Sequence, residues 1–414
     1  MRYLFPTLGS YGDVYPLLTL GRSLQLRGHE VNIVANPLFR KIVSQSGLGF
    51  VPLGQERDYL DEIEDPDIWH PTRGFQLVVK HGILRMLKPL YETILQFDPQ
   101  DTVVVSSALL FGAHIAHETH GYKFCTLHLQ PSMIRSRFAP PVLSNPSLPD
   151  WTPAWIVNGY YQSMDKFFID PLLKPVNEFR KELGLPAINR FFEKWIHSPQ
   201  LNIGLFPDWF APPQKDWSEN THLTGFIPHL VGQQSLSIET LNFIGNGDPP
   251  LVFTAGTAML HTESFFDTAV KVTEALKCRA IFLTKLNEQI PTQLPETIHH
   301  AEFEPLYDLL KRSAAFIYHG GIGSMAQGLA AGVPHLVMPM SLDQPDNAAR
   351  VRRLRVGDYV LPGNFKPGIV SAKLSGLFNN PSVRVNCQKY AQKIDFNKAI
   401  LDTCDLLENF SQSF

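Results

Sequence analysis

Short runs rich in β-branched and aromatic residues alternate with helix-like stretches along this chain, and a Gly-containing turn follows the first run of each half. This alternation is typical of βαβ units, in which crossover helices join parallel strands. A helix is expected over residues 109–120. We therefore predict an α/β fold with two Rossmann-like parallel-sheet domains. The main expected strands are residues 3–5, 31–35, 103–105, 124–127, 251–254, 280–283, 315–318 and 335–338.

The length of the chain, 414 residues, indicates more than one hydrophobic core. Two domains of roughly 200 residues each are the natural expectation. Residues 225–250 are rich in Gly and Pro and are predicted to form the linker. The predicted domains are residues 1–224 and 251–385, and residues 386–414 are expected to form helices that pack back on the N-terminal domain.

Composition narrows the function classes. The formal net charge of -3 argues against a polyanion-binding surface, so we expect no nucleic-acid partner. The four cysteines are far apart and form no CxxC pair, which favours free thiols in a reducing compartment. No signal peptide is recognisable, and the longest apolar stretch, residues 103–116, is too short and too polar to span a bilayer. A cytoplasmic protein is expected, with peripheral membrane contact left open.

The segment His319-Gly320-Gly321-Ile322-Gly323-Ser324 lies between a predicted strand and a predicted helix. Glycines let the backbone approach a ligand closely, and the first amides and the dipole of a helix favour negative charge in front of it. A diphosphate suits this position, and His319 and Ser324 add side-chain donors. The alternative is a Gly-rich turn that binds no ligand.

Asp343 and Gln344 come just after the predicted strand 335–338. In an open α/β sheet, residues beyond the carboxyl ends of strands face the ligand crevice. An adjacent carboxylate and amide can accept and donate hydrogen bonds to sugar hydroxyls. Asp343 could instead cap the following helix.

Two weaker signals stand beside these. Gly256 and Thr257 follow the first strand of the second domain, where they would bind phosphate or form a plain turn. His114, His117 and His120 share one helix face, but no Cys or suitably placed carboxylate completes a metal site. We therefore expect a solvated or interdomain face there, and no metal.

Residues 303–350 resemble the donor-binding signature of family-one nucleotide-sugar glycosyltransferases, which have the GT-B fold of two Rossmann-like domains facing a central cleft. The resemblance implies that His319, Gly321, Gly323 and Ser324 contact the diphosphate and that Asp343 and Gln344 hold the transferred sugar. Gln327 falls where the family usually has a ribose-binding Glu, and Phe303 falls near the aromatic that stacks on the base.

The turn Gly9-Ser10-Tyr11-Gly12-Asp13-Val14-Tyr15-Pro16 resembles the GSxGDVxP segment of the bacterial and sterol branches of this family. The resemblance implies that Asp13 is the general base. A carboxylate there can accept the proton of a neutral acceptor hydroxyl. The alternative is that Asp13 caps the following helix. In plant members of the family, an Asp after a later strand orients the catalytic base. Here Ser106 and Ser107 follow the strand at 103–105, so no such partner for Asp13 is evident.

Taken together, the resemblance implies an inverting hexosyltransferase that moves a sugar from a UDP- or dTDP-sugar, with UDP-glucose favoured, to a hydroxyl of a lipophilic acceptor. No metal or other cofactor is required by this scheme, and the acceptor-binding residues are unknown. Residues 39–53 and 195–225 resemble the rhamnosyltransferase subunit of rhamnolipid synthesis, so dTDP-rhamnose and a hydroxyacyl lipid are an alternative pair. A GT-B nucleotide-sugar epimerase and a catalytically silent nucleotide-sugar-binding partner are the rival functions.

Overall fold

The computed structural model describes residues 1–71, 73–143, 147–149, 151–228, 235–256 and 263–413. The chain divides into two compact units. Unit 1 comprises Met1–Ile68, Thr72–Val231 and Phe396–Phe414, and unit 2 comprises Trp69–Pro71 and Gly232–Asp395. The domain and linker boundaries that we expect from the sequence, residues 1–224, 225–250 and 251–385, remain predictions.

Unit 1 contains a seven-stranded parallel sheet in the order β3-β2-β1-β4-β5-β6-β7. The strand order reverses between β1 and β4, and both of these strands pair directly through Tyr3 and Val103. In such a sheet the point of reversal opens a crevice at the carboxyl ends of the strands. The strands are β1 (Arg2–Pro6), β2 (Glu30–Ala35), β3 (Gly49–Pro52), β4 (Thr102–Ser107), β5 (Lys123–His128), β6 (Leu201–Gly204) and β7 (Thr221–Leu223).

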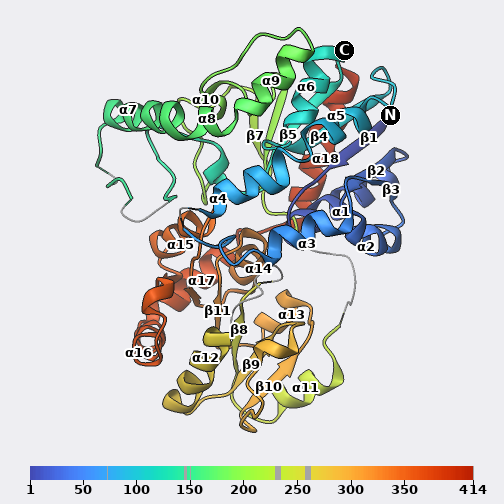
Figure 1. Ribbon diagram of the computed structural model, residues 1–414. Helices are drawn as coiled ribbons and strands as arrows, with labels where there is room; N and C mark the ends of the chain where they lie inside the picture. Colours follow the sequence, from blue (N-terminus) through green and yellow to red (C-terminus); the bar gives the residue numbers. More distant parts are fainter. Residues whose placement is uncertain (72, 144–146, 150, 229–234, 257–262, 414) are drawn as a thin grey trace. The chain divides into compact units, whose positions relative to one another are not determined.

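Helices cover both faces of this sheet, as Figure 1 shows. The α-helices of unit 1 are α1 (Tyr11–Leu26), α2 (Arg40–Gln45), α3 (Glu56–Glu64), α4 (Gly74–Leu77), α5 (Leu87–Ile94), α6 (Phe111–His120), α7 (Ala154–Met164), α8 (Asp170–Leu172), α9 (Lys174–Glu182), α10 (Phe191–Lys194) and α18 (Phe396–Gln412). The shorter or wider turns are η1 (Pro37–Phe39), η2 (Val78–Ile83), η3 (Pro131–Met133) and η4 (Asp165–Ile169).

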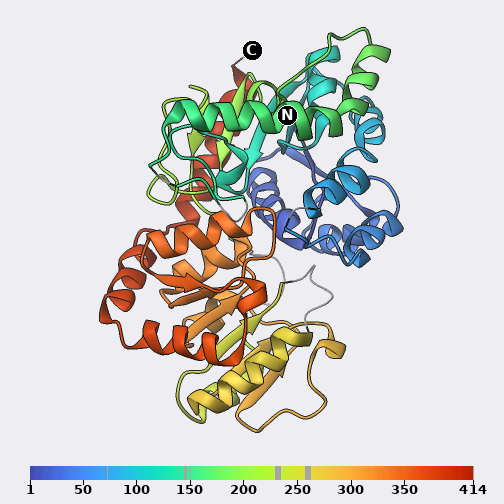
Figure 2. The same ribbon diagram turned by 60° about the vertical axis from the view of Figure 1, so that its left-hand side comes forward.

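Two hydrophobic clusters form the core of unit 1, one on each face of the sheet. Alternate residues of a strand point to opposite faces, so Tyr3 and Phe5 of β1 join one cluster while Leu4 joins the other. The C-terminal helix α18, drawn in red, packs on α1 and contributes Leu407 to the first cluster (Figure 2). The Tyr3 hydroxyl donates to the Leu407 carbonyl at 3.2 Å, which ties the last helix to the first strand.

Unit 2 contains a six-stranded parallel sheet in the order β10-β9-β8-β11-β12-β13, with the reversal between β8 and β11. Its strands are β8 (Leu251–Thr254), β9 (Ala280–Leu283), β10 (Ile298–Ala301), β11 (Ala315–Tyr318), β12 (His335–Val337) and β13 (Gly357–Tyr359). Its helices are α11 (Ile238–Gly245), α12 (Glu263–Leu276), α13 (Leu306–Leu310), α14 (Ile322–Ala331), α15 (Gln344–Arg353), α16 (Pro367–Phe378) and α17 (Pro381–Ala391), with η5 (Asn287–Gln289) and η6 (Pro362–Asn364).

The predicted strands all appear in these two sheets. Those at 251–254, 280–283 and 315–318 have the predicted limits, and the expected helix at 109–120 is α6, Phe111–His120. The predicted fold class, two parallel-sheet Rossmann-like domains, is confirmed. The apolar runs were informative because both faces of a parallel sheet are buried, so its central strands are almost continuously hydrophobic.

Candidate functional site

Three predicted donor-binding residues meet at the carboxyl ends of β8 and β11, where the strand order of unit 2 reverses. The His319 ring lies between Gly256 and Gly321. A Cβ at Gly256 would lie 2.6 Å from His319 Cε1, and a Cβ at Gly321 would lie 2.5 Å from His319 Nε2. Gly256 also has φ +93°, a conformation that favours glycine. Only glycine at both positions leaves room for the imidazole.

The environment of His319 fixes its charge. Burial lowers its pKa to about 4, so the ring is neutral at pH 7. Its Nδ1 atom is buried and has no hydrogen-bond partner within the described part of the chain. A neutral imidazole carries one N–H donor and one acceptor nitrogen. His319 can therefore donate one hydrogen bond to a phosphate oxygen without adding a positive charge.

Helix α14 begins directly after this ring. Gly321 is its N-cap residue, and Gly323 and Ser324 lie in its first turn, half-buried. A Cβ at Gly323 would meet no described atom within 4 Å, so open space lies in front of this turn. Gln327 follows one turn later, and its amide donates to the Gly323 carbonyl at 3.4 Å. The free amides of a helix start are suited to an anion such as a diphosphate.

The pair predicted to hold the sugar lies at the start of α15. Asp343 is the N-cap residue, without a side-chain cap bond, and Gln344 is the first residue of the helix. The Met340 amide donates to Gln344 Oε1 at 2.8 Å. Leu342, just before the pair, has φ +59°, which is a strained conformation for a branched residue. Strain of this kind is common at ligand sites.

Asn347 links these two parts of the site and had no role in the sequence prediction. Its side-chain amide donates to the Gly320 carbonyl at 2.9 Å and to Asp343 Oδ2 at 2.7 Å. The side chain is 1% exposed. Asn347 therefore holds the Asp343 carboxylate against the glycine turn after β11. Its spacing of four residues from Asp343 is the signal that could have revealed it, because residues i and i+4 share one helix face.

Phe303 follows β10, two strands away from β8 in the sheet. Its ring is half-buried, and Lys285 Nζ lies 5.6 Å from the ring centroid. The neighbouring Glu304 is 2% exposed and accepts hydrogen bonds from the Ser237 amide and from Thr240 Oγ1, at 3.1 and 2.6 Å. This anchor fixes the backbone beside Phe303. Thr257, the remaining predicted donor-binding residue, lies outside the described residues.

In unit 1, Asp13 lies in the first turn of α1, directly after β1. The Ser10 amide donates to Asp13 Oδ2 at 2.8 Å, and the Gly12 amide donates to Ser10 Oγ at 3.2 Å. This capping box shows that the alternative from the sequence, a helix cap, holds for Asp13. Capping does not exclude a second task, because the capping hydrogen bonds of the carboxylate use the single oxygen Oδ2.

The Asp13 side chain is half-buried, and burial raises its pKa to about 6, against the opposing effect of the Ser10 hydrogen bonds. A carboxylate with a raised pKa is a stronger base than an exposed one and is still mostly charged at pH 7. Asp13 therefore has the protonation state and basicity that a general base needs.

The three histidines of α6 do not form the uniform solvated or interdomain face expected from the sequence, because His114 is buried, His117 is half-buried and only His120 is exposed. His114 is 2% exposed, its Nε2–H donates to the Ile196 carbonyl at 3.0 Å, and burial lowers its pKa to about 3. His117 Nδ1 lies 2.6 Å from the Tyr122 carbonyl oxygen. Glu118 pairs with Arg180 at 2.8 Å. In the described ranges, no group of three or more His, Cys, Asp or Glu side chains is placed to hold a metal ion.

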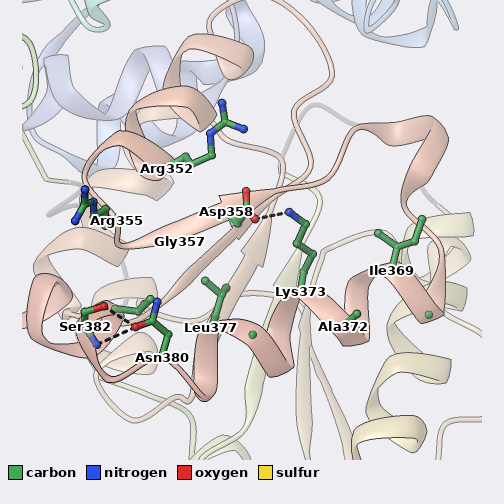
Figure 3. A pocket seen from close by; sticks show the side chains of 13 residues that line it. Arg352, Arg355, Gly357, Asp358, Ile369, Ala372, Lys373, Leu377, Asn380 and Ser382 are labelled. Carbon is green, nitrogen blue, oxygen red and sulfur yellow. Dashed lines mark hydrogen bonds and ion pairs between the residues drawn. The ribbon is translucent and has the colours of Figure 1, made fainter.

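A separate groove of ≈ 810 Å³ lies along the outer edge strand β13 of unit 2, between that strand and α16 (Figure 3). Arg352, Arg355 and the Lys373–Asp358 ion pair line it. None of the predicted donor-binding residues lines this groove. It is therefore distinct from the site at the carboxyl ends of β8 and β11.

Two protein-family models match the chain, one in each half. The glycosyltransferase family 28 N-terminal domain matches residues 3–138, and the erythromycin biosynthesis protein CIII-like C-terminal domain matches residues 279–397. Among curated proteins, the O-mycaminosyltylonolide 6-deoxyallosyltransferase of Streptomyces fradiae is 24% identical over 443 residues, covering 100% of this chain and 98% of the relative. The NDP-glycosyltransferase YjiC of Bacillus licheniformis is 22% identical over 412 residues, covering 97% and 95%.

Solved structures agree on the fold. The glycotransferase of kitacinnamycin superimposes with a TM-score of 0.75 at 18% identity, covering 99% of this chain and 98% of the other. The glycosyltransferase VinC, solved with dTDP, gives a TM-score of 0.72 at 18% identity and covers 100% of both chains.

The fold and the matched domains define an enzyme, a glycosyltransferase of GT-B architecture. Within that class, the N-terminal part of the chain matches the family 28 N-terminal domain, and the C-terminal part matches the erythromycin-CIII-like C-terminal domain. No helix among the described residues is long and apolar enough to cross a membrane.

Proposed function

We propose that this protein is an inverting hexosyltransferase that transfers a sugar from a nucleoside diphosphate to a hydroxyl group of a lipophilic small molecule or lipid. The donor binds in unit 2 and the proton of the acceptor is taken by Asp13 of unit 1.

One observation carries the donor half of this proposal. The glycine-clamped His319, the open first turn of α14 and the Asp343–Gln344 pair lie at consecutive strand ends of one sheet, and Asn347 connects them. Phosphate-binding amides and sugar-binding carboxylate and amide groups are therefore held by one set of hydrogen bonds. A nucleoside diphosphate sugar presents the two matching groups in series, an anionic diphosphate and a polyhydroxylated ring.

In the reaction, the acceptor O–H bond breaks and its proton goes to the Asp13 carboxylate. The acceptor oxygen attacks C1 of the sugar from the face opposite the nucleotide, which inverts the configuration. The bond between C1 and the phosphate oxygen breaks, and the electron pair leaves with the diphosphate. His319 and the amides of the first α14 turn stabilise the charge that develops there. These donors supply that stabilisation without requiring a metal ion.

The donor and acceptor are the finer part of the proposal. The sequence resemblance favours UDP-glucose, with dTDP-rhamnose as the alternative. Two of the structural neighbours, VinC and SsfS6, were solved with thymidine diphosphate, and another is a spinosyn rhamnosyltransferase. These neighbours support including dTDP-sugars beside UDP-glucose among the donors to be tested. The printed names of the spinosyn rhamnosyltransferase and of the O-mycaminosyltylonolide 6-deoxyallosyltransferase support including spinosyn-type and tylonolide-type acceptors in the panel.

The test is a thermal-shift screen of UDP- and dTDP-sugars, followed by mass spectrometry of products formed with a panel of hydroxylated lipids and aglycones. A stabilising donor and a product heavier than the acceptor by one hexose or deoxyhexose residue are the expected results. Conversion of the nucleotide sugar to an isomer in the absence of acceptor would instead identify an epimerase. Donor binding without turnover on any acceptor would favour the silent binding partner.

A further inference from the structure

The most exposed aromatic side chains among the described residues of unit 1 gather on one short stretch of chain. This stretch consists of the residues just before α7, α7 itself and η4, which follows α7 without a break. Two tryptophans and two phenylalanines in it are between 65% and 81% exposed. Together with two partly exposed neighbours they form what we call the aromatic patch: Trp151, Trp155, Ile156, Tyr160, Phe167 and Phe168.

The aromatic patch lies on the side of α7 that faces away from the core. Val157 and Tyr161 are four residues apart and buried, so they define the inward side of the helix. Ile156, Tyr160 and Phe167 follow one another at intervals of four and seven residues, and all three are exposed. Helices on the surface of soluble proteins ordinarily turn polar side chains to water. The outward side of α7 instead carries large rings, and it runs along the outside of unit 1 (Figure 1).

A buried ion pair fixes this orientation of the helix. Arg135, on the loop after β5, pairs with Asp165 at the start of η4 through Nη1 and Oδ1 at 2.6 Å, and both side chains are buried. The Arg135 guanidinium lies 5.0 Å from the centroid of the Tyr161 ring, and the Tyr161 hydroxyl donates to the Ser136 carbonyl at 3.3 Å. Breaking a buried ion pair is strongly destabilising. The helix is therefore held with its charged group inward and its aromatic rings outward.

The exposed apolar area of the patch is large for a soluble protein. Phenylalanine and tryptophan side chains bury roughly 150–250 Å² each when they are covered, so the patch presents on the order of 500 Å². The largest apolar patch on a typical soluble monomer is about 300–600 Å² and is often functional. An area of this size on a single helix marks a surface that binds a partner.

The charges around the patch favour a lipid surface as that partner. Residues 151–169 include two charged side chains, of which Asp165 is buried in its ion pair and Lys166 is exposed. Just beyond them, Asp170 is half-buried and accepts a hydrogen bond from the Arg190 amide at 3.0 Å. The exposed side of residues 151–169 therefore carries one positive charge and no negative charge. Aromatic rings beside a cation complement the anionic headgroup region of a bilayer.

We propose that the aromatic patch binds the surface of a membrane that contains anionic lipid. Trp151 and Trp155 lie at the level of the headgroups, which amphipathic rings prefer, and Phe167 and Phe168 reach the acyl boundary. The helix lies in the plane of the membrane, because α7 has 11 residues and η4 has five, whereas a spanning helix needs about 20. This inference goes beyond the proposed function and does not depend on the roles given there to Asp13 or to the donor site.

The first test is sedimentation of the full-length protein with vesicles made of equal amounts of phosphatidylcholine and phosphatidylglycerol. The wild type should bind, and the Phe167→Ser/Phe168→Ser variant should bind at least about tenfold more weakly, because two large apolar side chains no longer enter the lipid. Val385→Ser is the matched control, since Val385 is 66% exposed and lies on α17 in unit 2. Both variants should keep the wild-type melting temperature, because the replaced side chains are exposed.

The second test concerns the charge of Lys166. Lys166→Gln should weaken binding to the mixed vesicles roughly twofold to tenfold and leave binding to vesicles of phosphatidylcholine alone unchanged, because a cation gains only from anionic lipid. Lys271→Gln is the control, since Lys271 is exposed on α12 in unit 2. Equal losses in both lysine variants would show that the attraction is not specific to the patch and would remove Lys166 from the proposal.

Tryptophan fluorescence identifies the side chains that enter the lipid. The emission of the wild type should move to shorter wavelength when the mixed vesicles are added, and Trp151→Phe/Trp155→Phe should lose most of this shift while it still binds.

Three outcomes would overturn the inference. The first is a wild-type protein that sediments with neither kind of vesicle, and the second is wild-type binding by Phe167→Ser/Phe168→Ser. The third is a dimer in analytical ultracentrifugation that this variant breaks, without vesicle binding, which would assign the patch to a second copy of the chain. None of these measurements requires turnover, so the inference and the proposed function stand or fall separately.

Discussion

The proposed donor site in unit 2 and the proposed general base in unit 1 are built in different ways. In unit 2 most of the site comes from one stretch of sequence, residues 319–347, which Gly256 and Phe303 supplement, and close packing of side chains against backbone shapes it. In unit 1 the proposed site is Asp13 in the first turn of α1, a carboxyl group whose pKa burial has raised. The proposed donor recognition therefore depends on geometry, whereas the proposed proton transfer depends on electrostatics.

The largest expected effect is the loss of turnover when the Asp13 carboxylate is removed. Asp13→Asn should lower kcat by about 10²- to 10⁴-fold, because no carboxylate remains to accept the acceptor proton. Donor affinity, measured by calorimetry with the nucleoside diphosphate, should stay unchanged, because the donor site lies in unit 2. Asn also preserves much of the helix cap, so the melting temperature serves as the folding control. Turnover close to wild type would remove Asp13 from the mechanism.

A single added methyl group should disturb the proposed donor site in unit 2. In Gly321→Ala the new Cβ would lie 2.5 Å from His319 Nε2, and the resulting strain of about 1–3 kcal/mol should weaken donor binding roughly 5- to 150-fold. Gly323→Ala is the paired variant, because its Cβ meets no described atom within 4 Å.

The two glycine variants answer different questions. Gly321→Ala should disturb the site with or without ligand. Gly323→Ala should leave the ligand-free protein as stable as wild type or more so, since Ala is the better helix former. A loss of affinity in Gly323→Ala would therefore report the ligand itself close to this turn. Unchanged affinity in both variants would place the diphosphate elsewhere.

The pH dependence should distinguish the two sides. Asp13 must be deprotonated to act, and its pKa is raised to about 6, so kcat/KM should fall about tenfold per pH unit below pH 6. The His319 pKa is lowered to about 4, so this ring stays neutral and donor affinity should be flat from pH 5 to 8. An acid limb near pH 4, or donor binding that changes with the activity, would contradict this division.

The smallest expected effect concerns the link between the two parts of the donor site. Asn347→Ala leaves the Gly320 carbonyl and the Asp343 carboxylate without their shared donor, which should cost about 1–3 kcal/mol of unfolding free energy and raise the donor KM several-fold. Asn386→Ala is the control. That exposed amide also donates to a carbonyl, that of Arg355, at 3.3 Å. Equal losses in both variants would mean that Asn347 has no special place in the site.

The sequence determined the fold class by itself, and it was enough to predict most of the proposed donor site. Parallel strands that are buried on both faces show up in the sequence as apolar runs. A turn between strand and helix that could bind phosphate needs its glycines and its His319 close together in the chain. Both signals are local, so they can be read without a structure.

Only the tertiary structure decided what surrounds Asp13. Burial raises the pKa of Asp13 against the Ser10 hydrogen bonds, and no sequence spacing encodes how deeply the packed chain buries this carboxyl group. The same holds for His114, whose helix position suggested a surface but whose burial depends on what packs over α6. Desolvation and long-range charge are properties of the packed chain, and they appear only once distant segments have come together.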